Sequence, residues 1–353
     1  MFDYLIIGQG LAGTALSHTM QKEGKSVFVL EKEDPEAAYK VSAGIINPIT
    51  GKRINKTWKA EELFPFLFPF YEDLEKLLNV TLIRRLPVYK PFSSILEQNE
   101  WLSKAYEKNY TLFIDTEVPK SKYDEYIYNE HGGFETRLSG YVDVPLLVEH
   151  YRSYLKRENR YEKIKEFNLS CFPDHVAVNG IKSKRVIFCE GNKAVNNPYF
   201  NWLPFRPSKG QILEIESDQL NEHVILNKGA FIVPLGNNHF RAGSTYENTF
   251  EDQAPTEKAT QDIKNRLDNM LKKAYAIKDA KAGIRPAVAD RKPLIGLHPE
   301  IKTLGIFNGL GTKGVSLAPY FAMRFCKHLE KGEKLDPEVT IARFLSLYPG
   351  MSR

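Results

Sequence analysis

The chain has 353 residues, of which 42% are hydrophobic and 26% are charged. This composition is ordinary for a folded globular protein, leaves room for two domains, and excludes disordered and fibrous classes. The formal net charge of +5 is compatible with anionic substrates or nucleic acid but too small to require either. No stretch approaches the roughly 18 consecutive apolar residues of a membrane span, so we expect no membrane association.

The cysteines and histidines of the chain bear on whether it carries disulfides or a metal site. Cys171, Cys189 and Cys326 lie far apart without CxxC spacing, which favours a reducing cytoplasm over a disulfide scaffold. Each is expected to be a buried thiol of the core. The eight histidines form no HExxH or clustered pattern, so no metal site is predicted.

The chain opens with an apolar run that suits a buried parallel strand, followed by glycines at the spacing of a dinucleotide-binding turn and by a helical pattern. Gly8 allows the tight turn, Gly10 lets the backbone approach a pyrophosphate, and Gly13 lets the helix pack closely on the strand. Leu11 and Ala12 open this helix, whose N-terminal N–H groups and positive dipole end would face the phosphates.

A second parallel strand is expected over residues 26–30, ending at Glu31 and followed by Lys32. The separation of Glu31 from the glycines is close to the general spacing of about 20 residues at which a carboxylate accepts hydrogen bonds from an adenosine ribose. The same carboxylate disfavours the 2′-phosphate of NADP. The alternative is that Glu31 is a solvated carboxylate at the end of a strand and that the glycines form an ordinary turn. The glycines alone do not distinguish NAD from FAD as the bound dinucleotide.

Residues 42–53 are too rich in turn formers for a long helix and too apolar for a linker, so an ordered, buried loop is expected. Aromatic and leucine spacing predicts a helix over 61–78, despite Pro65 and Pro69. A further helix is expected to begin near Pro145. The remaining segments of this part read as strands: 82–89, 111–114, 176–178 and 185–189.

The second half of the chain alternates between sheet and helix. Residues 209–245 show alternation broken by turns, which predicts an antiparallel sheet, and an amphipathic helix follows over 256–273. A strand at 304–307, a glycine-rich turn at 308–314 and a helix over 315–329 end the chain. The strands near both chain ends are expected to form one parallel sheet, interrupted by the antiparallel insertion.

These segments, in this order, resemble the D-amino-acid oxidase-like (glycine/sarcosine oxidase-like) family of FAD-dependent oxidoreductases. Each segment matches the family only loosely on its own. Six such matches in the same order along the chain make the resemblance specific. The matching segments are the N-terminal glycines with Glu31, Ser42-Ala43-Gly44-Ile45-Ile46, Phe188-Cys189-Glu190-Gly191, Lys209-Gly210-Gln211, Gly283-Ile284-Arg285-Pro286 with Asp290 and Pro293, and the terminal glycine turn.

The resemblance implies an α/β fold: a Rossmann-like FAD-binding domain, with a parallel sheet flanked by helices, and an inserted α+β substrate domain built on an antiparallel sheet. The FAD-binding domain is expected to be discontinuous, comprising residues 1–80, 140–205 and 280–353. The substrate domain would comprise 81–139 and 206–279.

The resemblance also implies bound FAD, with adenosine at Glu31, pyrophosphate over 8–13 and isoalloxazine between the 42–47 loop and the 309–314 turn. No cysteine falls near 283–314, where members with covalent flavin carry one, so non-covalent FAD is expected. The residues implied to bind FAD are Gly8, Gly10, Leu11, Ala12, Gly13, Glu31, Lys32, Ser42, Ala43, Gly44, Ile45, Gly191, Gly283, Arg285, Gly309, Gly311, Thr312, Lys313 and Gly314.

Three residues are implied to act on the substrate. Arg285 occupies the position that binds the substrate carboxylate, a task suited to a planar guanidinium. Lys313 sits where some relatives carry a second basic residue near the flavin, to assist carboxylate binding or stabilise the reduced flavin. Phe231 falls where related glycine oxidases place a tyrosine, which argues against glycine as substrate. The alternatives are a structural ion pair for Arg285 and a solvated side chain for Lys313.

The implied reaction is oxidation of the C–N bond of a free or N-substituted amino acid by hydride transfer to flavin N5, with hydrolysis of the imine. The alternative is a tRNA wobble-uridine enzyme that removes a carboxymethyl group, because residues 310–319 and 239–246 resemble the FAD domain of the bifunctional tRNA 5-methylaminomethyl-2-thiouridine enzyme. This chain lacks that enzyme's methyltransferase half. A third hypothesis is an NAD-dependent dehydrogenase. The sequence does not identify the electron acceptor or the oligomeric state.

Overall fold

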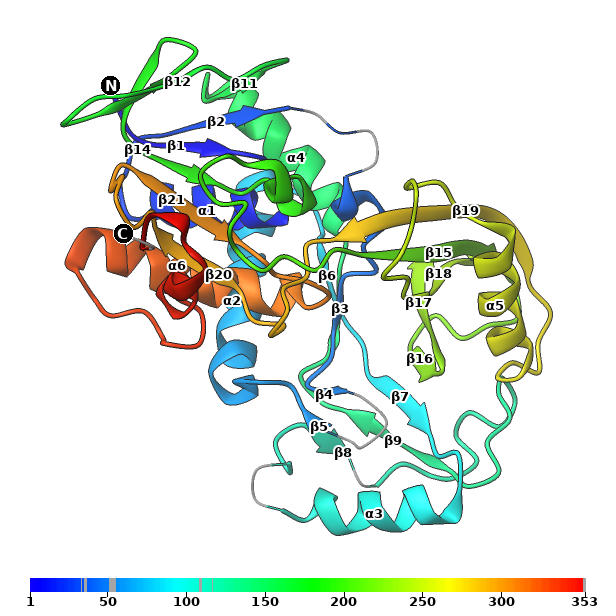
Figure 1. The fold of residues 1–353 in the computed structure, drawn as a ribbon. Coiled ribbons are helices and arrows are strands. Elements are labelled where there is room, and N and C mark those ends of the chain that lie inside the picture. Colours follow the sequence, from blue (N-terminus) through cyan, green and yellow to red (C-terminus); the bar gives the residue numbers. More distant parts are fainter. Residues whose placement is uncertain (33, 35–36, 51–54, 108–109, 116, 352–353) are drawn as a thin grey trace.

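A computed structural model describes residues 1–32, 34, 37–50, 55–107, 110–115 and 117–351. The chain forms two lobes, and both chain ends lie on the first of them (Figure 1). The first lobe is built on an eight-stranded sheet whose main path runs β11-β2-β1-β14-β13-β12, with β21 paired to β14 and β20 to β21. Its strands are β1 (Phe2–Ile7), β2 (Val27–Glu31), β11 (Tyr161–Lys163), β12 (Leu169–Cys171), β13 (Val176–Val178), β14 (Ile181–Phe188), β20 (Leu294–Leu297) and β21 (Leu304–Asn308).

The centre of this sheet is parallel. Strand β1 pairs in parallel with β2 and β14, and β14 pairs in parallel with β21. Strands from the two ends of the chain therefore share one sheet, as predicted, but the sheet is not wholly parallel: β12 pairs antiparallel with β13, β13 with β14, and β20 with β21. The apolar runs of the parallel strands are buried on both faces, as a parallel sheet covered by helices requires.

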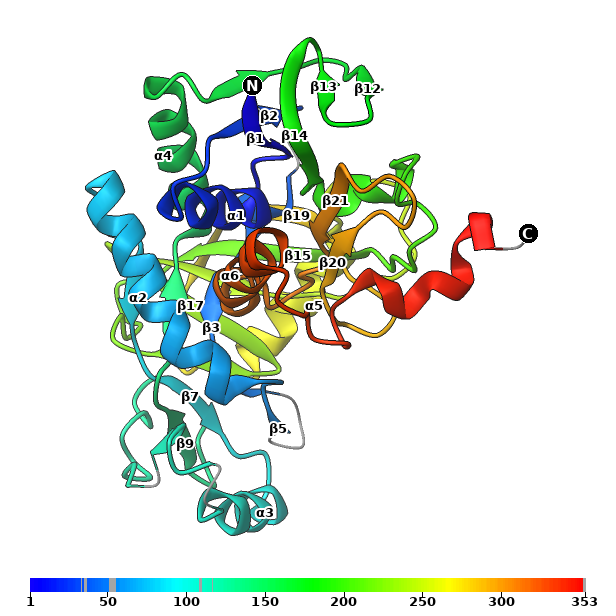
Figure 2. The ribbon, with the colours of Figure 1, turned by 90° about the vertical axis from the view of Figure 1, so that its left-hand side faces the viewer.

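Helices cover the sheet and position the cavity described below. Helix α6 (Gly314–Lys331) packs against α1 (Leu11–Lys22) and α2 (Ala60–Leu78), as Figure 2 shows, and α4 (Val144–Arg157) packs on α1. The aromatic and leucine stripe of α2 is the reason it forms a helix here: Phe64, Leu67 and Tyr71 are fully buried in the shared core. The helix continues through both prolines, as predicted.

The second lobe is built on another eight-stranded sheet, in the order β19-β15-β18-β17-β16-β7-β9-β8. All its pairs are antiparallel except β16 with β7, so the predicted antiparallel sheet is confirmed. The elements of this lobe are β7 (Val88–Pro91), β8 (Ile114–Asp115), β9 (Gly133–Thr136), β15 (Ser208–Glu216), β16 (Ile225–Lys228), β17 (Ala230–Gly236), β18 (His239–Gly243), β19 (Ala276–Arg285), α3 (Ile95–Ala105) and α5 (Glu257–Asp268).

Smaller elements lie between and around the lobes. A three-stranded sheet joins β3 (Ile45–Ile46), β10 (Gly140–Val142) and β6 (Ile83–Arg85), and β4 (Ile49–Thr50) pairs with β5 (Asn55–Lys56). The short 3-10 helices are η1 (Ala38–Val41), η2 (Gly191–Asn196), η3 (Ile341–Leu347) and η4 (Pro349–Met351). Of the predicted 42–53 loop, residues 51–53, including Lys52 and Arg53, lie outside the described residues.

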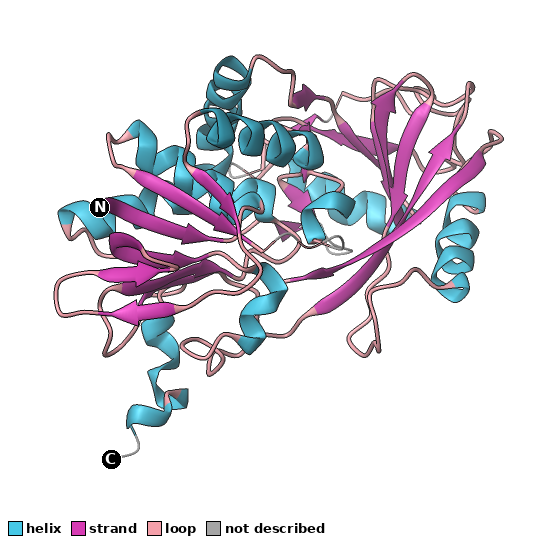
Figure 3. Cartoon of the chain, turned by 90° about the horizontal axis from the view of Figure 1, so that it is seen from above, coloured by secondary structure: helices cyan, strands magenta, loops and turns pink. Residues whose placement is uncertain are grey.

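The long strands β15 and β19 run from the junction of the lobes into the second sheet (Figure 1), and Figure 3 shows the two lobes from above. They pair antiparallel, with Ser208 at the start of β15 opposite Arg285 at the end of β19. This pairing brings Arg285 to the junction. The second sheet contains strands from both segments predicted for a substrate domain; the domain boundaries themselves stay a prediction.

Several local expectations were wrong. The single strand expected over 82–89 is two strands, β6 and β7, which pair in different sheets. The strand expected over 111–114 forms only at Ile114–Asp115. The helix expected to reach residue 273 ends at Asp268, because Met270 and Leu271 pair instead with the segment around Ile127.

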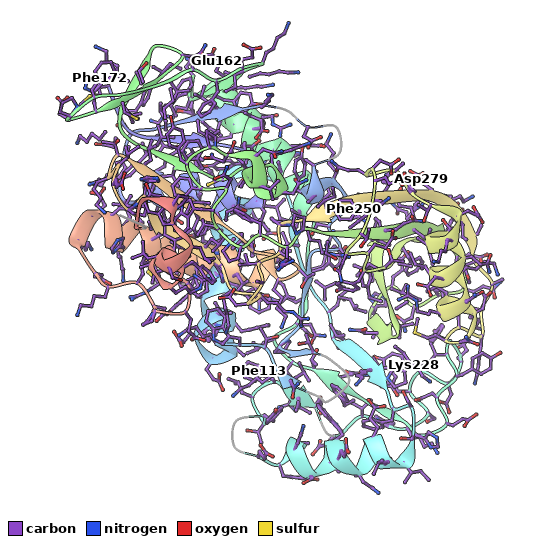
Figure 4. The ribbon with its side chains drawn as sticks, in the orientation of Figure 1. Phe113, Glu162, Phe172, Lys228, Phe250 and Asp279 are labelled. Carbon is purple, nitrogen blue, oxygen red and sulfur yellow. The ribbon has the colours of Figure 1, made fainter. Side chains whose placement is uncertain are left out.

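One cysteine also differs from expectation. Cys189 and Cys326 are buried, whereas Cys171 is exposed. It ends β12, and the next residue, Phe172, lies at the outer tip of the first lobe (Figure 4). Strand β12 is the last strand on the main path of the sheet, and its burial pattern leaves both Ser170 and Cys171 exposed. No helix within the described residues is long and apolar enough to cross a membrane.

Candidate active site

A cavity of about 960 Å³ is lined by residues of both lobes. This volume lies at the upper end of the range for small-molecule and cofactor sites. Most of the predicted site residues line it: Gly8, Gly10, Leu11, Ala12, Glu31, Lys32, Ser42, Ala43, Gly44, Ile45, Gly191, Phe231, Gly283, Arg285, Gly311, Thr312, Lys313 and Gly314. Gly13 and Gly309 are predicted site residues that do not line it.

The glycine turn after β1 forms one end of the cavity. A Cβ atom on Gly13 would lie 1.9 Å from the carbonyl oxygen of Gly8, so this glycine lets α1 approach β1. A Cβ atom on Gly10 would meet nothing within 4 Å, which leaves an open space where the turn lines the cavity. Gly10 is also the N-cap of α1 and provides no side-chain cap. The first N–H groups of α1 therefore suit an anionic group.

Two carboxylates flank this turn. Glu31, at the end of β2, accepts a hydrogen bond from the backbone N–H of Gln9. Glu190 follows β14 on the other side of β1, and its Oε2 accepts a hydrogen bond from Asn197 Nδ2 at 2.6 Å. Burial, and then the charge of Glu31, raise the pKa of Glu190. Glu190 lay within a matched segment of the sequence, but its position in the cavity was not foreseen.

The second helix N-terminus predicted from the sequence also lines the cavity. Lys313 is the N-cap of α6, and its Nζ donates hydrogen bonds to Thr50 Oγ1 and Thr57 Oγ1, each at 3.2 Å. Thr57 in turn donates to the carbonyl oxygen of Asn47. Burial, and then the charge of Lys292, lower the pKa of Lys313 to about 8. The solvated-lysine alternative does not describe this side chain.

Arg285 is held by neutral groups. Its Nη1 donates to the carbonyl oxygen of Lys209 at 3.2 Å, and its Nη2 donates to Ser244 Oγ at 2.9 Å and to the Thr245 carbonyl oxygen at 3.1 Å. Its Cζ lies 4.3 Å from the centre of the Tyr246 ring. Among the described residues, no carboxylate pairs with this guanidinium, so the structural ion pair considered from the sequence is not formed there.

Phe231, on β17, lines the same cavity as Arg285 and contributes an apolar ring without a hydroxyl. The lining residues that the sequence did not assign to the site include Thr50, Asn227, Ser244 and Tyr246. Asn47 lies in the 42–47 loop that was expected beside the flavin, and Gly210 lies in a matched segment. Ser244 and Tyr246 lie within residues 239–246, for which the sequence indicates only a resemblance. Within the described part of the chain, no group of three His, Cys, Asp or Glu side chains is arranged to hold a metal.

The groups that line the cavity fit FAD. A carboxylate at the end of β2 suits a ribose, the open space at Gly10 and the start of α1 suit a pyrophosphate, and the distant helix α6 offers a second N-terminus. A parallel sheet with this turn, joined to an antiparallel sheet that contributes an arginine to the cavity, is an arrangement suited to a dinucleotide-dependent oxidoreductase.

A family model described as FAD dependent oxidoreductase matches residues 3–327, and the chain belongs to this family. The protein is therefore an FAD-dependent oxidoreductase, and FAD rather than NAD is its cofactor. Its helices and sheets match a crystal structure of glycine oxidase from Geobacillus kaustophilus with a TM-score of 0.77, at 17% identity over 97% of each chain. That likeness shows the fold.

Two relatives by sequence align over most of the chain. An uncharacterized oxidoreductase, YurR, of Bacillus subtilis (strain 168) is 23% identical, covering 95% of this chain and 97% of the relative. The tRNA 5-methylaminomethyl-2-thiouridine biosynthesis bifunctional protein MnmC of Legionella pneumophila (strain Corby) is 24% identical over 84% of this chain. The match spans 45% of the length of that bifunctional protein.

Proposed function

We propose that this protein oxidises the C–N bond of a free or N-substituted amino acid whose carboxylate binds Arg285. The observation that carries the proposal is the cationic guanidinium of Arg285, partly buried in the cavity and hydrogen-bonded only to neutral acceptors among the described residues. A buried charge without a partner is costly, so an anionic ligand stabilises it. Glycine oxidase has the same fold, which is consistent with an amino-acid substrate.

The chain's own residues bind and orient the reactants. Bound FAD, held non-covalently, accepts the electrons of the oxidation, and water hydrolyses the imine product. The start of α1 and Glu31 would hold the two ends of the adenosine diphosphate portion, as the sequence implied. Arg285 orients the substrate by its carboxylate, while Phe231 and Ile212 contribute apolar surface that excludes water from the reacting bond. The Lys313 ammonium adds positive charge at the α6 end of the cavity.

The test is Arg285→Ala, assayed by anaerobic bleaching of the flavin with a panel of free and N-substituted amino acids. Loss of charge-assisted hydrogen bonds costs about 1.5–3 kcal/mol, so we expect the second-order rate constant of flavin reduction to fall roughly 10- to 150-fold. FAD content after denaturation should be unchanged. As a matched comparison, wild-type protein should discriminate equally against substrates whose carboxylate is replaced by a carboxamide. Undiminished turnover by Arg285→Ala would show that the carboxylate binds elsewhere.

A second candidate is oxidation of an N-substituted glycine carried on a wobble uridine of tRNA, with removal of its carboxymethyl group. The observation favouring it is the alignment with MnmC over 84% of this chain. The chemistry at Arg285 is the same, and only the bulk of the substrate differs. Failure of all small amines, together with tRNA binding that weakens as salt rises, would favour this candidate. Bleaching by a small amino acid, without salt-sensitive tRNA binding, would favour the first.

A further inference from the structure

The guanidinium of Arg285 occupies the space that a side chain at Gly210 would fill. Arg285 on β19 pairs with Ser208 on β15, and its side chain reaches diagonally to Gly210, where a Cβ atom would come within 1.9 Å of Nη2 and 2.2 Å of Cζ. Both atoms belong to the head of the side chain, not to its stem. The bare Cα of Gly210 thus provides the space in which the guanidinium lies.

Three of the N–H donors of the Arg285 guanidinium already make hydrogen bonds within the protein. Arginine has five N–H donors. Both hydrogens of Nη2 are directed to Ser244 Oγ and the Thr245 carbonyl oxygen, and one hydrogen of Nη1 is directed to the Lys209 carbonyl oxygen. Nε–H and the second Nη1–H are the donors for which the described residues provide no acceptor. They point in different directions, so either one of them can donate to a ligand in the cavity.

Tyr246 covers the same guanidinium from the segment that follows β18. Its ring centre lies 4.3 Å from Cζ, it lines the cavity, and yet 66% of the residue is exposed. An exposed aromatic ring gains little from the hydrophobic core. Its favourable contact is with the cation below it, because the face of an aromatic ring attracts a guanidinium.

We propose that Tyr246 is a positioning residue for substrate binding: its ring, with Gly210, fixes the Arg285 guanidinium so that one of its remaining N–H donors meets the substrate carboxylate. The proposal rests on the proposed role of Arg285 as carboxylate anchor. An arginine side chain freed from this contact regains several rotamers, and binding must then order it again. Tyr246 therefore acts on ligand affinity through Arg285, without touching the bond that reacts.

The experiment measures the affinity of the holoenzyme for acetate, with acetamide as the neutral control, from the change in flavin absorbance. Tyr246→Leu removes the ring, and we expect the Kd of acetate to rise about 3- to 20-fold, as the loss of a cation–π contact predicts. The KM of the substrate should rise similarly, with kcat within about twofold. Tyr246→Phe keeps the ring and should restore most of the affinity. Tyr128→Leu, at another exposed tyrosine over a cation, Lys272, should match wild type.

A double-mutant cycle with Arg285→Ala separates the two proposals. We expect Tyr246→Leu to have no further effect on acetate binding when Arg285 is absent. If the wild type does not bind acetate, or Arg285→Ala binds it as well as the wild type, the proposed anchor is wrong. If Arg285→Ala loses acetate but Tyr246→Leu does not, only the role of Tyr246 is overturned. An equal loss with and without Arg285 also overturns that role, since the ring would then act on the ligand independently.

Discussion

At the scale of single residues, burial sets the chemistry of Lys313. An exposed lysine has a pKa near 10.5, whereas burial and the charge of Lys292 lower that of Lys313 to about 8. In the flavin-free protein, the unfolded chain therefore holds this proton more tightly than the folded chain. Below about pH 8, keeping the ammonium charged inside the fold lowers the free energy of unfolding. That penalty fades as pH rises from about 8 through 10.5 and the unfolded lysine also loses its proton.

Replacing Lys313 by methionine tests this linkage. We expect Lys313→Met to raise the free energy of unfolding of the flavin-free protein by roughly 1–3 kcal/mol at pH 7, because each pKa unit corresponds to about 1.4 kcal/mol and partial exposure reduces the effect. The gain should shrink as the pH approaches 10.5. Urea unfolding at several pH values measures it, with Lys258→Met on the exposed face of α5 as control. Equal stability of Lys313→Met and wild type at pH 7 would contradict the lowered pKa.

At the scale of elements, Gly10 and Gly13 of the same turn have different structural roles. A side chain at Gly13 would push α1 away from β1, while one at Gly10 would enter open space in the cavity. The backbone of Gly10 has φ of −83°, which alanine adopts without strain. Packing between strand and helix thus depends on Gly13, and cofactor access on Gly10.

We expect Gly13→Ala to lower the free energy of unfolding of the flavin-free protein by about 1–3 kcal/mol, as overpacking does. Gly10→Ala should leave that stability nearly unchanged but weaken FAD binding at least about tenfold, because its methyl group would fill the approach to the pyrophosphate. Circular dichroism melting and the FAD content of purified protein distinguish the two variants. Normal FAD retention by Gly10→Ala would place the pyrophosphate elsewhere.

At the scale of the whole molecule, the cavity joins segments that are distant in sequence. Its lining includes Ile7 and Ser316, near opposite ends of the chain, and Ile212 and Phe231 from the second sheet. A ligand that fills the whole cavity therefore contacts both lobes. Such a ligand binds the folded chain and not the unfolded one, so it stabilises the native state by mass action.

Adding FAD to flavin-free protein should accordingly raise the melting temperature. At 100 times Kd the gain is about 2.7 kcal/mol, which corresponds to roughly 4 °C for a chain of this size. FMN lacks the adenosine that Glu31 would bind and should give a smaller shift, and NAD should give none. Differential scanning fluorimetry with the three nucleotides measures this. An NAD shift equal to that of FAD would contradict the assignment of the cavity.

The sequence by itself determined the parts whose signals are local. The strand, turn and helix around Gly8, Gly10 and Gly13 follow from apolar runs and glycine spacing, and Glu31 follows from its place at the end of the next strand. The antiparallel sheet over 209–245 was legible from alternation. Such patterns are readable because side-chain periodicity reports directly on which face of an element is buried.

Only the tertiary structure decided which residues meet across the chain. Residues 82–89 divide between two sheets, and the predicted helix ends at Asp268, because distant partners compete with local propensity. Exposure of Cys171 likewise depends on where its strand lies in the sheet. At the candidate site, Arg285 is fixed by Gly210, Ser244 and Tyr246, and Lys313 by two threonines. Spacing along the chain does not encode these contacts, because they arise where strands from separate segments pair.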